Sequence, residues 1–490
     1  GLGKMTRSYH AFYRRHMIRS PYNHKKRPIL INNWEATYFD FDTDKLLDIA
    51  REAKKDGIEM LVMDDGWFGK RNKDDSSLGD WVVNEEKIKG GLKNLVDKVN
   101  EIGLEFGIWF EPEMISPDSD LYREHPEWAI QIPGREATEI RCQYVLDLSR
   151  PEVQDYAYEC VAKILRSANI KYVKWDMNRQ LSDLGSTYLD KDSQQELFHR
   201  YVLGMYAMQE RLVQEFPDLL LENCSGGGAR FDPGMLYYSP QIWCSDDTDA
   251  IERLEIQEGT ALIYPLCSMG AHVSVCPNHT VGRVTPFTTR GHVALAGTFG
   301  YELDITKLPE EERKLIPEQT AMYHKYHELI REGEYYRILS CRENHRSDCW
   351  AVASEDKSEV LVSSNLGASA NENDGASAES IQMIQSRFMT QSVDVFFADY
   401  NFFYSLGEFD YLADIREYLP EELLEKYKDD LVYVKSTETG KKYPIGIKLE
   451  KNAWVKETGW YPDTCVVGLA DGLKNKDLAV KFIEEKILEE

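Results

Sequence analysis

The sequence lacks the marks of a disulfide-stapled protein, a zinc protein or a membrane protein. Its nine cysteines are odd in number and scattered, without paired CxxC spacing or an accompanying cluster of histidines. That pattern fits reduced thiols in a cytoplasmic protein and argues against a disulfide framework or a zinc site. No stretch approaches the ~18 uninterrupted apolar residues of a transmembrane helix, so no membrane span is expected.

Positive charge is also scarce. The chain has 58 Lys and Arg against 84 Asp and Glu, which gives a formal net charge of -26 and a pI near 4.9. This balance argues against nucleic acid and anionic membranes as partners, whereas an uncharged substrate is compatible with it.

The composition is that of a folded, multidomain chain. Hydrophobic residues make up 42% and aromatic residues 11% of the sequence, as in globular proteins. The 490 residues exceed what one ordinary core holds, so two or more domains are expected. The sequence begins at Gly1 without an initiator Met or an apolar signal segment, and we expect it to be a piece of something longer.

Short apolar runs alternate with amphipathic stretches between about residues 27 and 301. We predict strands at residues 29–34, 60–65, 105–110, 144–148, 172–176, 219–224, 241–246 and 271–276. Stretches between them predict helices, among them residues 43–55, 92–102, 151–168, 194–214 and 251–264. Eight strand–helix units over roughly 270 residues match a (β/α)8 TIM barrel. A doubly wound open sheet is the alternative, but no Gly-rich dinucleotide loop follows the first strand.

The predicted domain organisation is α/β, with a barrel followed by a β-rich segment and a small α/β tail. We assign the barrel to residues 27–334 and the start of a β-domain to residues 335–366. Residues 367–380 read GASANENDGASAES, which is small, polar and typical of a linker. Residues 381–490 alternate strands with Glu- and Lys-rich helices and form the tail.

Active sites of TIM barrels lie at the C-terminal ends of the strands, and unusual polar residues gather at those ends here. Six predicted strands end in carboxylates, Trp or Gly, namely at Trp34-Glu35, Asp64-Asp65-Gly66-Trp67, Trp109, Asp176, Cys224-Ser225-Gly226 and Asp246-Asp247.

The segment YVKWDMNR delivers a Lys and an Asp at the end of one predicted strand. Because side chains alternate faces along a strand, Lys174 and Asp176 share a face. The ammonium group keeps Asp176 ionised, as a covalent nucleophile must be. A buried ion pair that only holds the fold is an equally good interpretation of these two residues alone.

Asp246, on the seventh predicted strand, supplies a second carboxylate opposite Asp176 on the fifth. Two carboxylates across a barrel mouth are the minimum for glycoside hydrolysis, in which one attacks the anomeric carbon and the other protonates the leaving oxygen. We expect the like charges of Asp247 and Asp249 to raise the pKa of Asp246, which suits an acid/base. Asp249 is also the predicted N-cap of the following helix.

Asp64 and Asp65 form a polar pair that can accept hydrogen bonds from sugar hydroxyls. A metal site is the less favoured alternative, because no His lies near the other strand ends. Trp34 and Trp109 offer apolar ring faces to a sugar, although a lone Trp is more often part of a core.

Two further features have competing interpretations. Cys224 precedes Ser225 and three glycines beginning at Gly226, a run that brings the backbone close to a ligand. A flexible turn is the alternative for the last two of these glycines. Arg141 precedes a predicted strand and is either a donor to a substrate hydroxyl or part of a structural salt bridge.

Six segments together, in this order and spacing, resemble the family 36 retaining α-galactosidases of the bacterial melibiase and raffinose-cleaving type. They are ILINNWEATYFDF, LVMDDGWFG, GIWFEPEMI, YVKWDMNR, LLENCSGGGARFD and WCSDDTDAIERL. The resemblance covers about residues 13–366. It implies cleavage of terminal α-linked galactose from sugars such as melibiose and raffinose, by double displacement and without a metal or organic cofactor.

The resemblance also implies residue roles. Asp176 becomes the nucleophile, Asp246 the acid/base, and Asp64 and Asp65 hold the O4 and O6 region of galactose. The implied helpers in substrate binding are Trp34, Trp109, Arg141, Lys174, Cys224 and Gly226.

The chain departs from the family pattern at both ends. The family has an N-terminal β-sandwich that helps to build a homo-tetramer, and residues 1–26 correspond only to its exit. Residues 381–490 loosely resemble part of an extracellular solute-binding lipoprotein instead of the family's compact β-domain. An α-N-acetylgalactosaminidase, a transgalactosylase and a non-catalytic galactose-binding fragment are the alternatives.

Overall fold

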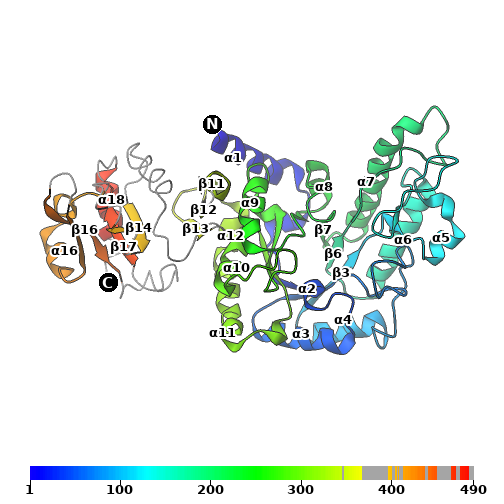
Figure 1. Ribbon diagram of the computed structural model, residues 1–490, viewed down its shortest axis with the longest axis horizontal. Helices are drawn as coiled ribbons and strands as arrows, with labels where there is room; N and C mark the ends of the chain where they lie inside the picture. Colours follow the sequence, from blue (N-terminus) through cyan, green and yellow to red (C-terminus); the bar gives the residue numbers. More distant parts are fainter. Residues whose placement is uncertain are drawn as a thin grey trace. The chain divides into compact units, whose positions relative to one another are not determined.

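The computed structural model describes residues 1–344, 347–366, 395–399, 403–404, 407, 412–435, 440–449, 465–470 and 475–484. The chain divides into two compact units, Gly1–Ala368 and Ser369–Glu490. Figure 1 colours both units along the sequence. Within the described part of the chain, no helix has both the length and the apolar character needed to span a bilayer.

The first unit is built around a closed barrel of eight parallel strands, which confirms the predicted fold class. Around the barrel the strands follow the order β1-β10-β9-β8-β7-β6-β3-β2. Their bounds are β1 (Leu30–Asn32), β2 (Met60–Met63), β3 (Glu105–Phe110), β6 (Tyr172–Trp175), β7 (Leu220–Asn223), β8 (Gln241–Trp243), β9 (Met269–Ser274) and β10 (Thr298–Glu302). Most of their residues are buried, because helices cover the outer face of the barrel.

The helices around the barrel follow the amphipathic stretches of the sequence. The longer ones are α3 (Thr43–Lys55), α4 (Gly91–Ile102), α6 (Pro151–Ser167), α7 (Leu197–Glu215), α9 (Ala250–Ala261), α10 (Phe287–Ala294) and α12 (Ile316–Glu332). Their ends carry residues that commonly begin or end helices. Asp42 caps α3 by accepting a hydrogen bond from Lys45 N, Pro151 opens α6, and Gly103 ends α4 with a φ of 96°.

One predicted strand is wrong, and one barrel strand was not predicted. Residues 144–148 do not enter the barrel, because only β5 (Tyr144–Val145) is extended and it pairs antiparallel with β4 (Met114–Ile115) in a separate two-stranded sheet. The eighth barrel strand is instead β10, which pairs with β1 and β9. Asp176 therefore follows the fourth barrel strand rather than the fifth, and Asp246 follows the sixth rather than the seventh.

The residues before the barrel are helical and pack against the end of α9 and the residues that follow it. They form α1 (Leu2–Phe12), η1 (Tyr13–Met17) and η2 (Pro21–His24). His10 Nε2 lies 2.8 Å from Ala261 O, and the ring of Tyr13 lies 5.2 Å from that of Tyr264. The assignment of residues 1–26 to a β-sandwich exit stays a prediction, as do the other domain boundaries.

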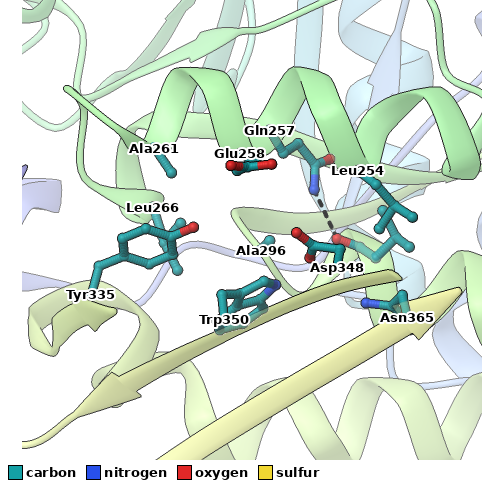
Figure 2. A pocket seen from close by; sticks show the side chains of 11 residues that line it. Leu254, Gln257, Glu258, Ala261, Leu266, Ala296, Tyr335, Asp348, Trp350 and Asn365 are labelled. Carbon is teal, nitrogen blue, oxygen red and sulfur yellow. Dashed lines mark hydrogen bonds between the residues drawn. The ribbon is translucent and has the colours of Figure 1, made fainter. Parts of the chain in front are cut away.

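Three antiparallel strands complete the first unit, namely β11 (Glu334–Leu339), β12 (Ser347–Ala353) and β13 (Val360–Leu366). Side chains of this sheet and of α9 enclose a small cavity of about 10 Å³, shown in Figure 2, where the carboxyl groups of Asp348 and Glu258 both lie. Burial, followed by the charge of Glu258, raises the pKa of Asp348 to about 7.

The second unit contains a four-stranded antiparallel sheet in the order β14-β17-β16-β15. Its elements are β14 (Val395–Asp399), α16 (Glu421–Lys426), β15 (Leu431–Lys435), β16 (Lys442–Lys448), β17 (Cys465–Leu469) and α18 (Lys476–Phe482). The mixture of strands and helices agrees with the predicted α/β tail. The predicted linker, residues 367–380, lies outside the described residues. The likeness of residues 381–490 to a solute-binding protein stays a prediction.

Candidate active site

The polar residues singled out from the sequence converge on the C-terminal mouth of the barrel. Asp64 and Asp65 follow β2, Trp109 lies in β3, Lys174 lies in β6, and Asp176 follows β6. Trp34 follows β1, Cys224 and Gly226 follow β7, and Asp246 follows β8, whereas Arg141 comes from the loop before β5. Because all eight barrel strands are parallel, these ends share one rim.

Asp176 is a buried carboxylate with several hydrogen-bond donors. Its residue is 6% exposed. Trp109 Nε1 and Asn178 Nδ2 donate to its Oδ2 at 3.1 and 2.9 Å, and Met177 N donates to its Oδ1 at 2.8 Å. Hydrogen bonds to the charged form stabilise that form. The donors therefore hold one carboxylate oriented at the end of β6.

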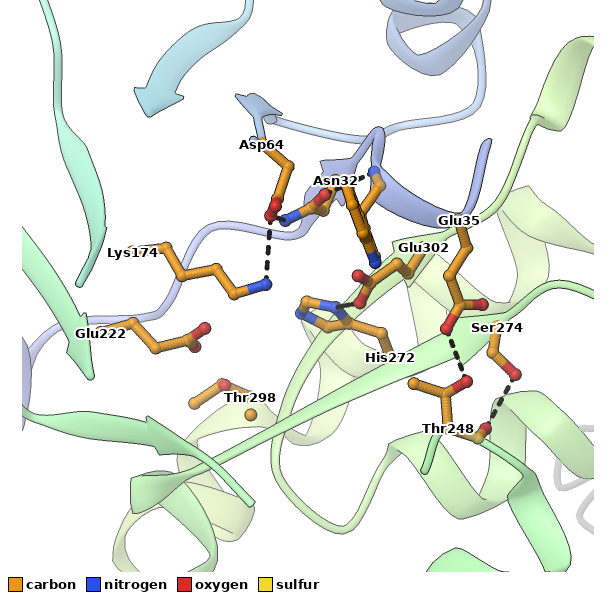
Figure 3. Close-up of polar contacts among 12 residues, drawn as sticks. Asn32, Glu35, Asp64, Lys174, Glu222, Thr248, His272, Ser274, Thr298 and Glu302 are labelled. Atoms are coloured by element: carbon orange, nitrogen blue, oxygen red, sulfur yellow. Dashed lines mark hydrogen bonds and ion pairs between the residues drawn. The ribbon is translucent and has the colours of Figure 1, made fainter. Parts of the chain in front are cut away.

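The expected ion pair between Lys174 and Asp176 is replaced by a different one. Lys174 Nζ lies 3.1 Å from Asp64 Oδ2, which also accepts a hydrogen bond from Asn32 Nδ2 at 2.6 Å (Figure 3). Burial opposes the charge of Lys174, but the carboxylates of Asp64 and Glu302 outweigh burial and hold the Lys174 pKa well above its ordinary value. Strand alternation predicts the face of Lys174 correctly but not which neighbouring carboxylate it meets.

Asp65 is held by a second ion pair. Arg71 donates to it through Nε and Nη2, each at 2.9 Å, and both side chains are buried. Burial raises the pKa of Asp65, although the nearby Arg71 opposes that shift. The two neighbouring aspartates thus have separate cationic partners, Lys174 for Asp64 and Arg71 for Asp65.

Asp246 differs from these carboxylates because it is exposed to solvent. Its carboxyl accepts no hydrogen bond from any residue in the described part of the chain. Surrounding protein atoms at the mouth and, next, the charge of Asp176 raise its pKa to about 6. The direction of this shift agrees with expectation, but Asp247 and Asp249 do not cause it. Asp249 instead caps α9 by accepting hydrogen bonds from Ile251 N and Glu252 N, as predicted.

The glycine run after β7 is required by packing against the neighbouring loop. A Cβ atom on Gly227, whose φ is 88°, would lie 2.8 Å from Ser245 Cα and 2.9 Å from Asp246 N. Beside this turn, Cys224 is buried and its sulfur accepts a hydrogen bond from Gly227 N at 3.4 Å. The glycines therefore bring the turn after β7 against the backbone that carries Asp246.

The two tryptophans and Arg141 have different surroundings. Trp109 is 2% exposed and packs in an aromatic cluster with Phe68, at a ring distance of 6.3 Å. Trp34 is partly exposed and contacts the ring of Tyr38 edge-on at 5.2 Å. Arg141 is exposed, donates to Asn178 O at 3.3 Å, and its charge acts to lower the pKa of Asp246.

Two acidic residues at the mouth were not predicted from the sequence. Glu302 ends the missed strand β10 and pairs with His272 Nδ1 at 3.0 Å (Figure 3). Glu111 lies two residues after Trp109, and burial followed by the charge of Asp176 raises its pKa to about 8. The acidic motif GIWFEPEMI contained the signal for Glu111, whereas Glu302 had none because its strand was not recognised.

The carboxylates at the mouth are side chains of a type that also binds metal ions. Within the residues described, no group of three or more His, Cys, Asp and Glu side chains lies close enough together to hold a metal ion. The polar groups at the mouth are instead carboxylates paired with Lys, Arg, Trp and Asn donors. Such a set can bind hydroxyl groups and perform nucleophilic and acid/base chemistry.

Comparison with known proteins decides the family. The melibiase family profile matches residues 1–333. The chain belongs to the melibiase family. Among curated members, it is 53% identical over 362 residues to α-galactosidase AgaA of Geobacillus stearothermophilus, covering 74% of this chain and 50% of that protein. It is 54% identical to the bifunctional α-galactosidase/sucrose kinase AgaSK of Mediterraneibacter gnavus, covering 76% of this chain and 39% of that protein.

Solved structures of melibiase relatives superpose on this chain. The GH36 α-galactosidase AgaA from Geobacillus stearothermophilus aligns with a TM-score of 0.74 at 48% identity, covering 82% of this chain and 55% of that one. The galactosidase domain of AgaSK aligns with a TM-score of 0.73 at 53% identity, covering 76% and 51%. A variant of AgaA was solved in complex with raffinose. The chain spans about half the length of the curated relatives it matches.

Proposed function

We propose that this chain removes terminal α-linked galactose from oligosaccharides such as melibiose and raffinose, with retention at the anomeric carbon. The observation that carries the proposal is the unequal pair of carboxyl groups at the mouth. Asp176 is buried and fixed by hydrogen bonds, whereas Asp246 is exposed and has a pKa of about 6. Two carboxyl groups in unlike environments at one site are the pattern of a pair that divides the roles of nucleophile and acid.

The proposed reaction is a double displacement. Asp246, protonated, gives its proton to the glycosidic oxygen while Asp176 attacks the anomeric carbon and forms a covalent galactosyl ester. Asp246 is then ionised and takes a proton from water, which attacks the same carbon and releases Asp176. The hydrogen bonds from Trp109 and Asn178 hold the carboxyl group of Asp176 in position for the attack.

Galactose recognition is proposed for the same rim. Asp64 and Asp65 accept hydrogen bonds from sugar hydroxyls near O4 and O6, with Lys174 bound to Asp64 as a further donor. We assign supporting contacts to Trp34, Trp109, Arg141, Cys224 and Gly226. Raffinose bound to a variant of AgaA supports this choice of substrate class.

The fit of the turn after β7 supports galactose over N-acetylgalactosamine. Gly227 and Gly228 already pack against the backbones of Ser245 and Cys244. The turn therefore has little room to move outward for an acetamide group. Transfer to a sugar acceptor instead of water stays an alternative that uses the same covalent intermediate.

We also propose a cytoplasmic location, and the state of the cysteines supports it. Cysteines with free thiols are Cys142, Cys160, Cys224, Cys244, Cys267, Cys276 and Cys341. Reduced thiols are typical of cytoplasmic proteins. The homo-tetramer implied by the family resemblance stays a prediction.

The test is hydrolysis of p-nitrophenyl α-galactoside followed by proton NMR. A retaining enzyme releases α-galactose first, and mutarotation then produces the β-anomer. Early β-galactose would contradict double displacement. If folded protein binds galactose but releases none from the substrate, the chain is a binding fragment and the proposed activity is wrong.

A further inference from the structure

Glu35 joins three strand ends at the barrel mouth. It lies in the short helix α2 (Trp34–Thr37) after β1, and its residue is 6% exposed. Thr248 Oγ1 donates to its Oε1 at 2.6 Å, and Val275 N donates to its Oε2 at 3.0 Å. His279 Nδ1 lies 3.2 Å from Oε1. Because Thr248 follows β8 while Val275 and His279 follow β9, one buried carboxylate connects the loops after β1, β8 and β9.

Thr248 lies two residues after Asp246 and is fixed by further contacts. Its hydroxyl accepts a hydrogen bond from Asn278 Nδ2 at 3.0 Å, in addition to the one it donates to Glu35. Its carbonyl oxygen accepts a hydrogen bond from Ser274 Oγ at 2.8 Å. Figure 3 shows Glu35, Thr248 and Ser274 in one connected line. Thr248 is buried, so these contacts compete little with water.

The backbone next to Asp246 is held by Arg253 on α9. Arg253 Nη2 donates to Ser245 O and Nε donates to Asp247 O, both at 2.6 Å. The Asp246 carboxyl, by contrast, is exposed and accepts no hydrogen bond from the described residues. Its position therefore depends on how the flanking backbone is held, by Arg253 before and after it and by the Glu35–Thr248 contact further along.

We propose that Glu35 is a positioning residue that, through Thr248, aims Asp246 at the oxygen of the leaving group. This inference rests on the proposed function, because it requires Asp246 to act as the acid. A misplacement of about 1 Å in a catalytic group costs on the order of 10²-fold in rate. A leaving group that departs without protonation is insensitive to such a misplacement, so the loss depends on the substrate.

The experiment compares Thr248→Val with Thr248→Ser on two substrates. Thr248→Val removes the hydroxyl that donates to Glu35 and keeps the branched shape of the side chain, whereas Thr248→Ser keeps the hydroxyl. We expect Thr248→Val to lower kcat/KM for raffinose by about 10- to 100-fold and for p-nitrophenyl α-galactoside by less than about threefold. Thr248→Ser should match the wild type on both. Glu35→Gln, which cannot accept with both side-chain atoms, should show the same substrate dependence.

A matched control uses another buried threonine. Thr298 Oγ1 donates to Met269 O at 3.1 Å at the opposite end of the barrel, so Thr298→Val removes a buried hydroxyl without touching the mouth. It should change both activities equally and slightly. Equal losses on both substrates in folded Thr248→Val and Glu35→Gln, or wild-type activity of both on raffinose, would overturn the inference. Failure of the wild type to cleave either substrate refutes the proposed function instead, and the inference with it.

Discussion

The barrel mouth and the cavity between α9 and β12 each hold an aspartate with a raised pKa, and the two aspartates differ in what surrounds them. At the barrel mouth the pKa of Asp246 is about 6, and in the cavity between α9 and β12 the pKa of Asp348 is about 7. Enclosure by protein is the first cause in both, and a second carboxylate adds to it, Asp176 at the mouth and Glu258 in the cavity. The electrostatic causes are therefore alike.

Access separates the two regions. Asp246 is exposed at the C-terminal rim of the strands, whereas Asp348 is 3% exposed beside a cavity of about 10 Å³. A cavity of that size holds about one water molecule, far less than a sugar. A raised pKa thus marks a candidate site only where a substrate can reach the group. Substitutions in each region test whether the mouth is catalytic and the cavity structural.

The largest effect is expected at Asp176. Asp176→Ala removes the proposed nucleophile, so kcat for raffinose should fall on the order of 10⁴-fold or more. Binding of galactose, measured by titration calorimetry, should persist because Asp64 and Asp65 keep their partners. Undiminished turnover would remove Asp176 from the mechanism, and lost binding together with lost activity would indicate a collapsed mouth.

Asp246→Ala should have the next largest effect, and the effect should depend on the substrate. Loss of general acid catalysis lowers kcat/KM for raffinose by roughly 10²- to 10⁴-fold. The p-nitrophenolate group departs without protonation, so glycosylation by p-nitrophenyl α-galactoside should suffer much less. Steady-state and burst kinetics on both substrates separate the two cases. Equal losses would count against the acid/base role.

Trp109→Phe tests how far Asp176 depends on its hydrogen bonds. The substitution keeps a buried ring and removes the Nε1–H that donates to Asp176. Hydrogen bonds to charged groups contribute about 1.5–3 kcal/mol, so kcat/KM should fall by about 10- to 100-fold. Trp81→Phe is the matched control, because Trp81 packs in the same aromatic cluster, 6.3 Å from the Trp109 ring. A similar loss in both variants would show that packing rather than the hydrogen bond matters.

A change of pH should alter kcat/KM for raffinose less than these substitutions do. Asp246 must be protonated to act as the acid, and it is protonated below its pKa of about 6. Therefore kcat/KM for raffinose should reach about half of its maximum near pH 6 and fall further as the pH rises. The activity of Asp246→Asn should lack this limb. A profile that is flat from pH 5 to 8 in the wild type would contradict the assignment.

Sequence periodicity predicted the barrel and the set of strand ends because buried parallel strands leave continuous apolar runs. It missed β10 because that strand reads TFGYE, where Gly300 fits between His272 and Leu30 O and weakens the strand signal. It also could not predict spatial neighbours. The ammonium of Lys174 meets Asp64 from another strand, and Asp176 rather than the adjacent Asp247 acts on Asp246. Such contacts depend on barrel closure, which the order of residues does not reveal.

The smallest effect on catalysis is expected at Asp348, where stability should change instead. Burial raises its folded-state pKa from 3.8 to about 7, so its favourable contribution is complete below about pH 4 and is lost as the pH rises to about 7. Asp348→Asn removes the ionisable group and should leave kcat/KM for raffinose within about twofold. At pH 8 it should increase the free energy of unfolding by on the order of 4 kcal/mol.

Urea unfolding of Asp348→Asn and the wild type at several pH values from 4 to 8 measures this difference directly. The stability gain should grow between pH 4 and 7 and then stay constant. In that window Asp348 of the wild type is ionised in the unfolded chain but protonated in the folded protein, whereas the asparagine of the variant does not titrate in either state. Asp356→Asn is the control from the exposed turn between β12 and β13, where hydrogen bonds from Ser354 and Ser358 lower the Asp356 pKa to about 2. It should produce no such gain. A large loss of activity in Asp348→Asn with unchanged stability would mean that the cavity communicates with the mouth, and the contrast between the two regions would be wrong.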